Sequence, residues 1–336
     1  MKYLKTKTIL LFILVSQCLF AGQDIGIFEK ILNASGSFEE TTSAFETALG
    51  ESNLILHTKY DFNSSDENGQ KSRLYLLTSP SYTKAAEGEA PNTVSAQILR
   101  VAIYEYDSGR KTFINMTNPV AHAMVFYEDS KSYKALVSAA KNVADEIKSV
   151  VANVPGQVVS EQQPPLRDED DLNDFNGDGP AKMMAMWRNW EDSQDDLFKE
   201  KSIAEAVTKV ESIINNSKDA GAEECEGWRI LTKIEFKDAV YFGITNHYTE
   251  NRTTSINSDF RNKGKSDDAP LPGIDHTPAH PVEIIVYKDG RKIKAIQYGQ
   301  MWRMQLYYWD SGYAAFAKYT MIPGIISGSI EDLFEE

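Results

Sequence analysis

Residues 100–130 read RVAIYEYDSGRKTFINMTNPVAHAMVFYEDS, and residues 281–311 read PVEIIVYKDGRKIKAIQYGQMWRMQLYYWDS. Shifted by 181 positions, the two stretches align without a gap. Nine of the 31 aligned pairs are identical, where composition alone would give about two. Each stretch reads as a β-hairpin, because alternating apolar residues lead to a turn whose glycine, Gly109 or Gly290, supplies a positive φ. The sequence therefore predicts a tandem repeat of one domain.

The similarity continues toward the N-terminus at other offsets. Ser37 with Glu40, and Ser202 with Glu205, are the pattern of a capping box, and each pair opens an amphipathic helix. The segments that follow read as strands in both copies: HTKYDF at 57–62 and LTKIEF at 231–236, then YLLTSPSYT at 75–83 and YFGITNHYT at 241–249. A second helix over residues 136–151 follows the first hairpin.

These elements predict an α+β protein of two tandem domains. In each domain, helices would pack on one face of an antiparallel sheet of about four to five strands. The expected boundaries are 22–152 for the first domain, 153–194 for a joining segment, and 195–336 for a second, divergent domain. We expect the two copies to pack against each other as an intramolecular pseudo-dimer, because duplication commonly preserves the interface of an ancestral dimer.

The first copy resembles a known family, the bacterial domain of unknown function 302. The motifs that carry the resemblance are SFEET at 37–41, YLLTSP at 75–80, VAIYE at 101–105, the turn at Gly109, and Asn118-Pro119. The resemblance covers residues 24–152 and is looser over 195–335, where Val286 replaces Glu105, Gly299-Gln300 replaces Asn118-Pro119, and Arg303 replaces His122. It implies the fold of each copy and brings no established activity.

The N-terminus has the layout of a secretory signal, with three lysines, an apolar run from Ile9 to Val15, and small residues at Ala21 and Gly22. We expect cleavage after Ala21 and a periplasmic or secreted protein. The alternative is lipidation at Cys18, although Gln17 stands where a lipoprotein signal has a small residue. No later run is long and apolar enough to predict a membrane span.

The net charge and the number of cysteines limit which classes of partner and of chemistry are expected. Loss of the three signal lysines changes the net charge from −14 to −17, which argues against nucleic acid and anionic membranes as partners. Cys225 would remain as the single thiol, so no intramolecular disulfide is expected. Its neighbours Glu223, Glu224 and Glu226 disfavour a nucleophilic thiolate. Because the sequence contains no recognisable catalytic motif, we favour a binding role and leave catalysis open.

The joining segment contains two candidate metal sites. Asp174, Asn176 and Asp178, followed by Gly179, match the start of a calcium loop, but Ala185 stands where the closing carboxylate belongs. Asp171 or Glu191 would have to complete such a site, and a solvated acidic linker is the alternative. A helix predicted over 181–198 aligns four side chains that would bind Cu(I) or form a packing surface: Met183, Met186, Trp187 and Trp190.

Histidines provide the remaining candidates. Asp275, His276 and His280 lie close together before a strand and could bind a divalent metal; the alternative is an exposed loop with unpaired histidines. His122, predicted at the start of a strand, could line a cleft and act as an acid–base group or as an axial ligand of a haem-like cofactor. Its candidate companions are Glu105, Asn118, and Met116 or Met124. The alternative is a hydrogen-bonded structural histidine.

The expected function is therefore that of an exported binding or accessory protein of the bacterial cell envelope. It would bind a small ligand or an envelope protein, with the site in the first copy. One alternative is a redox or cofactor accessory, or an enzyme, that uses His122 and Glu105. Another is an interaction module with a calcium-binding linker. At the C-terminus, Pro323 predicts a helix break near Ile322, and we expect Ile325, Ile326, Ile330 and Phe334 to be buried within the chain.

Overall fold

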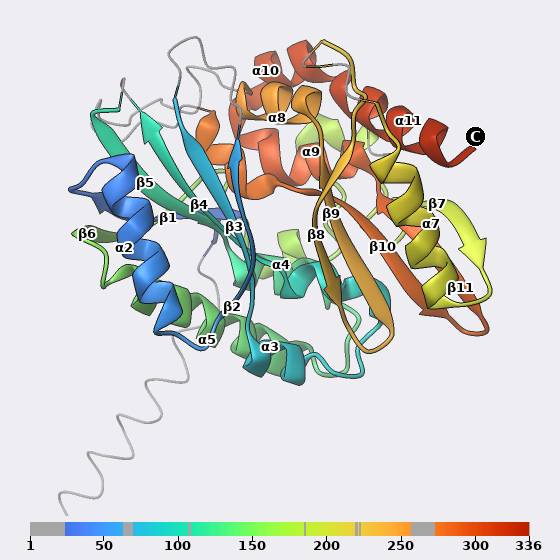
Figure 1. Ribbon diagram of the computed structural model, residues 1–336, viewed down its shortest axis with the longest axis horizontal. Helices are drawn as coiled ribbons and strands as arrows, with labels where there is room; N and C mark the ends of the chain where they lie inside the picture. The colour runs from blue at the N-terminus through green and yellow to red at the C-terminus, as the bar shows by residue number, and fades with distance from the viewer. Residues whose placement is uncertain are drawn as a thin grey trace, which may run out of the picture.

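The computed structural model describes residues 24–62, 70–106, 109–184, 186–218, 221, 223–256 and 273–335. These residues form an α+β structure with two antiparallel sheets, which lie side by side in Figure 1. The expected signal peptide and its cleavage site lie outside the described residues. Within the described part of the chain, every helix is too short or too polar to cross a membrane.

The first sheet has six strands in the order β2-β3-β4-β5-β1-β6. Their bounds are β1 Phe28–Ala34, β2 Ile55–Phe62, β3 Ser72–Thr78, β4 Leu99–Tyr106, β5 Lys111–Thr117 and β6 Gly156–Gln162. The helices of this half are α2 Phe38–Gly50, α3 Pro80–Ala85, the 3₁₀ helix η1 Pro91–Gln97, α4 Pro119–Phe126 and α5 Tyr133–Val151. β6 comes from the predicted joining segment and extends the sheet beyond β1.

The second sheet has five strands in the order β7-β11-β10-β9-β8. Their bounds are β7 Gln194–Glu200, β8 Arg229–Glu235, β9 Ala239–Thr245, β10 Val282–Asp289 and β11 Lys292–Tyr298. The helices are α7 Ile203–Asn215, α8 His247–Thr254, η3 Ile274–Ala279, α9 Gln300–Tyr308, η4 Trp309–Ser311, α10 Gly312–Tyr319 and α11 Ile322–Glu335. Two short helices, α6 Glu169–Leu172 and η2 Gly179–Met183, lie in the joining segment.

The two sheets correspond strand by strand, with β2-β3-β4-β5-β1 matching β8-β9-β10-β11-β7. Each sheet also has bulges at matching places. One residue is skipped in the pairing of β2 with β3, at His57, and in that of β8 with β9, at Leu231. Another is skipped at Ile31 in β1 and at Leu197 in β7. Because a bulge fixes strand register, these positions define which residues correspond.

This correspondence changes the alignment of the hairpins. Four residues separate Tyr106 from Lys111, whereas two separate Asp289 from Lys292. The gapless alignment therefore holds for β5 with β11 but is two residues off for β4 with β10. A shift of two leaves every side chain on the same face of the strand, so the pattern looked intact in the sequence.

The register identifies the counterpart of Arg100. Arg100 lies opposite Leu76, and Leu76 lies opposite the first residue after the β2 bulge, Thr58. Glu283 lies opposite Gly243, which in turn lies opposite Thr232, the first residue after the β8 bulge. Arg100 and Glu283 thus occupy corresponding positions in the two sheets.

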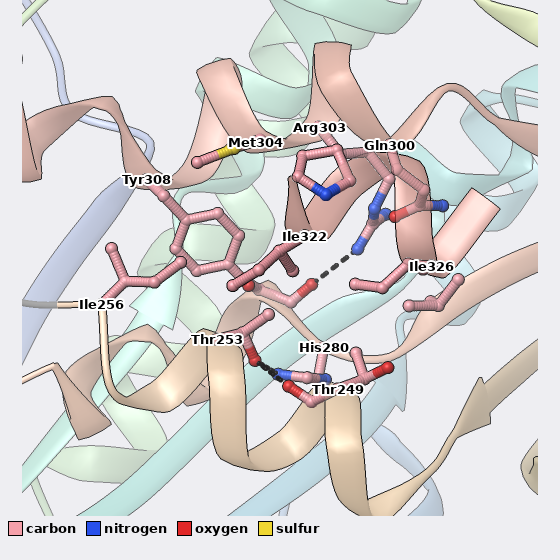
Figure 2. A pocket seen from close by; sticks show the side chains of 13 residues that line it. Thr249, Thr253, Ile256, His280, Gln300, Arg303, Met304, Tyr308, Ile322 and Ile326 are labelled. Carbon is pink, nitrogen blue, oxygen red and sulfur yellow. Dashed lines mark hydrogen bonds between the residues drawn. The ribbon is translucent and has the colours of Figure 1, made fainter. Parts of the chain in front are cut away.

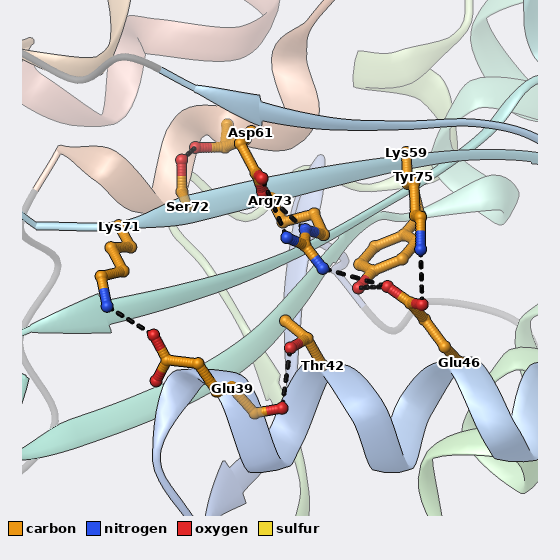
Figure 3. A network of polar contacts seen from close by, with 10 residues as sticks. Glu39, Thr42, Glu46, Lys59, Asp61, Lys71, Ser72, Arg73 and Tyr75 are labelled. Atoms are coloured by element: carbon orange, nitrogen blue, oxygen red, sulfur yellow. Dashed lines mark hydrogen bonds and ion pairs between the residues drawn. The ribbon is translucent and has the colours of Figure 1, made fainter.

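Helix α2 is fixed to the first sheet by its cap and by a polar network. Ser37 and Glu40 form the predicted capping box, with Glu40 Oε2 accepting from Ser37 N at 2.8 Å. Further along α2, Glu46 accepts from Lys59 at 2.7 Å and from Arg73 and Tyr75 at 3.1 Å each, as Figure 3 shows. These charges neutralise one another, so this network supports the fold.

Three sequence predictions about local structure were wrong. The expected strands at 75–83 and 241–249 end at Thr78 and Thr245, and helices α3 and α8 follow. The segment containing His122 is helix α4 and not a strand, because Asn118 accepts a hydrogen bond from Val120 N as its cap and Pro119 occupies the first turn.

The helix expected over 181–198 is also absent. The chain makes the short helix η2, then Met186 and Trp187 adopt positive φ values of 53° and 58°, and β7 follows. Trp187 is 62% exposed, whereas Trp190 is 1% exposed and packs against Phe126. Trp187 is therefore open to solvent and Trp190 is part of the core, so the apolar residues of this segment do not form one helical stripe.

The two halves meet through reciprocal contacts. Helix η1 of the first half packs on β9 and β10, and η3 of the second half packs on β3, β4 and β5. Strand β2 lies beside β8, where Thr58 Oγ1 donates to Leu231 O at 3.0 Å. In Figure 1, α4 and α9 lie in the centre, between the sheets. Residues of both halves thus share one continuous core.

The C-terminal segment breaks where the sequence predicts. Helix α10 ends at Tyr319 and α11 begins at Ile322, which places Pro323 in the first turn, where the missing N–H costs little. Ile326, Ile330 and Phe334 are buried within the chain as expected, but Ile325 is 41% exposed.

Candidate functional site

A buried charge network occupies the junction between the sheets. Glu283 accepts from Arg100 through one carboxylate oxygen and from Arg303 through the other, and all three side chains are buried. Arg100 also donates to Ser95 at 2.9 Å, and Arg303 donates to the carbonyl oxygens of Ala279 and Pro281 at 2.9 and 3.1 Å. A buried carboxylate held by two guanidinium groups, one from each half, fixes the relative position of the halves.

His122 belongs to this network. Arg100 Nη1 donates to the Tyr307 hydroxyl at 2.9 Å, which leaves the hydroxyl proton for His122 Nε2 at 3.1 Å. Burial, with Arg100 and Arg303 nearby, holds the pKa of His122 well below its ordinary value. The histidine is thus a neutral acceptor in a structural network.

The residues grouped with His122 in the sequence are not brought together. Glu105 faces the α2 side of β4 and accepts from Lys71 N at 3.2 Å, whereas Arg100 faces the opposite side. The five-residue separation along β4 corresponds to roughly 17 Å. Asn118 caps α4 and donates to Gln162 at 3.1 Å. Met116 is in the core and Met124 is partly buried against it.

The second histidine group is buried, so the expectation of an exposed loop was wrong. Asp275, His276 and His280 lie on or beside η3, which packs under the first sheet. His276 Nε2 contacts Asp310 at 3.1 Å, and Asp275 Oδ1 accepts from Gly273 N at 2.7 Å. Because each side chain turns to a different partner, no cluster of three or more metal-ligating groups forms here or elsewhere in the described residues.

His280 lines a small cavity, shown in Figure 2. The Thr253 hydroxyl donates to Thr249 O at 2.6 Å, so His280 Nε2 must donate to Thr253 Oγ1 at 2.5 Å. His280 Nδ1 is therefore an acceptor without a partner, and the Thr249 hydroxyl, which can donate or accept, also has none. Burial and the nearby Arg303 lower the pKa of His280 to about 3.

This cavity suits water better than a ligand. Its volume is about 30 Å³, and its other walls include Met304, Ile322 and Ile326. A buried water needs about 10–15 Å³ and several polar partners. One or two waters between His280 Nδ1 and the Thr249 hydroxyl would satisfy both groups.

The candidate calcium loop is docked against the second half. Trp302 Nε1 donates to Phe175 O at 2.8 Å, and Gly177 lies directly against Gln305, leaving no room for a side chain. Asp178 is paired with Arg167 at 2.7 Å. Asp174, Asn176 and Asp178 line an acidic pocket together with Lys182. This part of the joining segment is packed structure, and Ala185 lies outside the described residues.

A groove at the junction is large enough for a small molecule. Its volume is about 730 Å³, within the roughly 300–1,000 Å³ typical of ligand sites. It runs between β2, α3 and η1 of the first half and the β8–β9 hairpin of the second. The apolar lining includes Ile55, Pro80, Ala86, Ala90, Pro91, Val94, Ile234, Phe236 and Ala239. Ile55 is 47% exposed, an apolar side chain left open to solvent at the groove wall.

Few polar groups reach the apolar part of the groove. His57 Nε2 contacts Thr78 Oγ1 at 2.8 Å, and burial lowers the pKa of His57. Gln97 also borders the groove, but its side chain is 4% exposed and its Oε1 is buried, so it does not open onto the groove. Isolated polar groups in an apolar groove are what orients a small ligand.

The corresponding place at the other end of the junction is filled. There Glu250, fully buried, accepts from Tyr60 at 3.0 Å, Arg229 at 2.7 Å and Thr245 at 2.9 Å. By strand register and helix start, Ile234 corresponds to Tyr60, Ile55 to Arg229, and Thr83 to Glu250. In the groove, these three positions carry smaller or apolar side chains.

Sequence reasoning missed Arg100, Glu283 and the groove. A charged residue inside an apolar strand, as in LRVAI and VEIIV, was the available signal for the buried pair. No comparable signal marks the groove, because its walls come from segments that are far apart in the sequence.

Comparison with known proteins adds a fold likeness. No family model matches the chain, and no curated protein matches it. Among solved structures, a similar chain is described as an uncharacterized conserved protein DUF302 from Bacillus stearothermophilus. The similarity covers 38% of this chain and 99% of that one, with 14% sequence identity and a TM-score of 0.32.

Proposed function

We propose that this protein binds a small, mainly apolar ligand in the groove between its two halves. The observation that carries the proposal is the difference between the two ends of the junction. One end is closed by Tyr60, Arg229 and Glu250, and the corresponding end is a groove of about 730 Å³ with an exposed Ile55 on its wall. Solvent-exposed apolar surface in a concave site favours binding of an apolar molecule.

The architecture supports two further parts of this proposal. The matching strand order and the matching bulges support a duplicated domain that resembles the domain of unknown function 302. The two copies would pair as a pseudo-dimer. The groove would then be a site that neither copy forms alone. We also propose that the mature chain is exported after cleavage near Ala21, which the N-terminal sequence supports.

The other candidate functions receive less support from the geometry. His122 is buried with its Nε2 bonded to Tyr307, and it is remote from Glu105, so we propose neither a haem-like cofactor nor acid–base catalysis there. The acidic loop at Asp174, Asn176 and Asp178 has one carboxylate paired with Arg167, so we do not propose a calcium function for it.

A substitution that fills the groove with a large side chain tests whether the ligand binds there. Ala90 is an exposed residue of the groove lining. Ala85 is an exposed alanine of α3 that lies outside the lining, and it serves as the control position. Nile red, a neutral apolar dye, should bind the mature protein with a rise in fluorescence. Ala90→Trp should weaken this binding at least tenfold, and Ala85→Trp should leave it unchanged. Equal binding by both variants, with both still folded by circular dichroism, would place the site elsewhere.

A further inference from the structure

The uncharged polar side chains of the groove come from the wall of the first half. His57 and Thr78 both line the groove, and His57 Nε2 contacts Thr78 Oγ1 at 2.8 Å. His57 is the bulge residue of β2, and a bulge re-aims the side chain that it carries. The corresponding bulge residue of β8 is Leu231. The imidazole of this polar pair is therefore particular to the first copy.

The facing wall, from the second half, is apolar. Ile234 lies opposite Tyr241 in the strand register, and both belong to the core cluster that the two halves share. Ala239 belongs to the same cluster, and Phe236 packs against it. A molecule in the groove would thus contact hydrocarbon on one side and the polar pair at one place on the other.

The polar pair leaves one ring nitrogen for a ligand. The imidazole of His57 is partly exposed, and Nδ1 has no partner among the residues that the structure describes. If Nε2–H donates to Thr78 Oγ1, Nδ1 is an acceptor; if the Thr78 hydroxyl donates to Nε2, Nδ1–H is a donor. A hydroxyl group both donates and accepts, so it satisfies Nδ1 in either tautomer.

The pair presents no charge to a ligand. Burial lowers the pKa of His57, so the imidazole is neutral at neutral pH, and the threonine hydroxyl is uncharged. An ionised group placed against the pair would lose its hydration without meeting an opposite charge there. A neutral group that forms one hydrogen bond is the better match.

We propose that the ligand is a neutral alcohol or phenol, whose hydroxyl group bonds to His57 Nδ1 and whose apolar body lies against Ile234 and Phe236. Thr78 holds the ring in place through Nε2. This inference rests on the proposed function of the groove and adds the polar group of the ligand to it.

Three probes that share a phenylbutyl body test the head group. They are 4-phenylbutan-1-ol with a hydroxyl, 4-phenylbutyrate with a carboxylate, and butylbenzene with no polar group. Each is titrated against Nile red bound to the mature full-length protein at neutral pH, and its dissociation constant follows from the displacement of the dye. We expect the alcohol to bind about tenfold more tightly than the carboxylate.

Variants of His57 locate the hydrogen bond. His57→Leu installs the residue of the corresponding bulge, so the strand should still form. It should lower the affinity for the alcohol, relative to that for butylbenzene, by about three- to tenfold, which is the usual effect of losing one hydrogen bond. His57→Gln keeps a donor and an acceptor and should restore this ratio to within about twofold.

His247→Leu is the matched control. His247 is also a partly exposed histidine, but it lies on α8, outside the groove lining. The substitution should leave the ratio of the two affinities unchanged. Circular dichroism confirms that each variant is folded.

The outcomes distinguish this inference from the proposed function. If the carboxylate binds as tightly as the alcohol, or if no probe displaces the bound dye, the ligand is not a neutral alcohol. A ratio of alcohol to butylbenzene affinity that is the same in His57→Leu as in the unaltered protein would overturn the role of His57. Failure of Nile red to bind the unaltered protein would instead overturn the groove itself as a site.

Discussion

Arg100 and Glu283 occupy corresponding positions in the two sheets, and they bond to each other. In a two-fold arrangement, a residue that meets its own counterpart lies beside the axis. Two identical chains would place like charges there, Arg against Arg or Glu against Glu, which is repulsive in a buried site. A single chain with two halves can carry opposite charges at this point, so joining the halves covalently permits a junction that a homodimer could not form.

The charge network predicts unequal costs for its members. Glu283→Gln leaves Arg100 and Arg303 buried without a carboxylate, and such unpaired charges cost about 3–5 kcal/mol. Arg100→Met leaves Glu283 paired with Arg303 and should cost clearly less. Urea unfolding monitored by circular dichroism measures both free energies. If Arg100→Met destabilises the protein as much as Glu283→Gln, the shared carboxylate is not the centre of the network.

Buried histidines predict that stability falls in mild acid. The pKa of His280 is lowered from 6.5 to about 3, and that of His122 is also lowered, so below about pH 6.5 the unfolded chain binds protons that the folded chain does not. The contribution of the neutral histidines to the free energy of unfolding is complete above their unfolded-state pKa and is lost as the pH falls below it. For His280 alone the loss between about pH 7.5 and about pH 5 is about 2 kcal/mol.

His280→Gln isolates this contribution, because glutamine keeps a donor for Thr253 and does not titrate. The difference in unfolding free energy between the variant and the unaltered protein should move by about 2 kcal/mol in favour of the variant over that pH range. Met304→Leu, on the same cavity wall, should show a difference that does not depend on pH. A constant difference for His280→Gln as well would mean that His280 is not held neutral.

Two tryptophans three residues apart predict opposite responses. Trp190 is 1% exposed and packs against Phe126 and Tyr298, so Trp190→Ala should destabilise the protein by about 3–5 kcal/mol. Trp187 is 62% exposed, and Trp187→Ala should change stability by less than about 0.5 kcal/mol. Thermal unfolding of the two variants checks this. Similar losses in both would mean that residues 186–190 form the continuous apolar stripe expected from the sequence.

The sequence predicted much of the fold because its strongest signals are local. The alternation in residues 100–130 and 281–311 and the cap at Ser37 identified both sheets and the first helix, and Pro323 located the helix break. The short helices were missed because caps such as Asn118-Pro119 interrupt strands without a long periodic pattern. The Met/Trp segment was misread because helical spacing in the sequence does not reveal that Met186 and Trp187 adopt positive φ.

The candidate site was harder to predict for a different reason. His122 and His280 were singled out as chemically versatile residues, yet both are neutral partners in buried networks that involve Tyr307, Arg303 and Thr253. Whether a histidine is buried depends on packing between halves about 180 residues apart in the sequence. The groove depends on the same packing, so its walls could be assembled only from the three-dimensional structure.

The closed end of the junction provides a design for closing the groove. Installing its residues at the corresponding positions, Ile55→Arg, Thr83→Glu and Ile234→Tyr together, should reproduce the bonds that Glu250 makes with Tyr60 and Arg229. The variant should remain folded, because each new charge has a partner. It should not bind Nile red.

Thr83→Glu alone is the informative comparison. It adds a carboxylate to the groove lining without the arginine and tyrosine that would cover it, so the groove stays open and becomes more negative. Nile red should therefore still bind to the single variant. Fluorescence titration of Nile red with the single and triple variants measures both outcomes. If the triple variant folds and still binds the dye, the two ends of the junction do not correspond as the strand register implies, and the groove is not kept open by Ile55, Thr83 and Ile234.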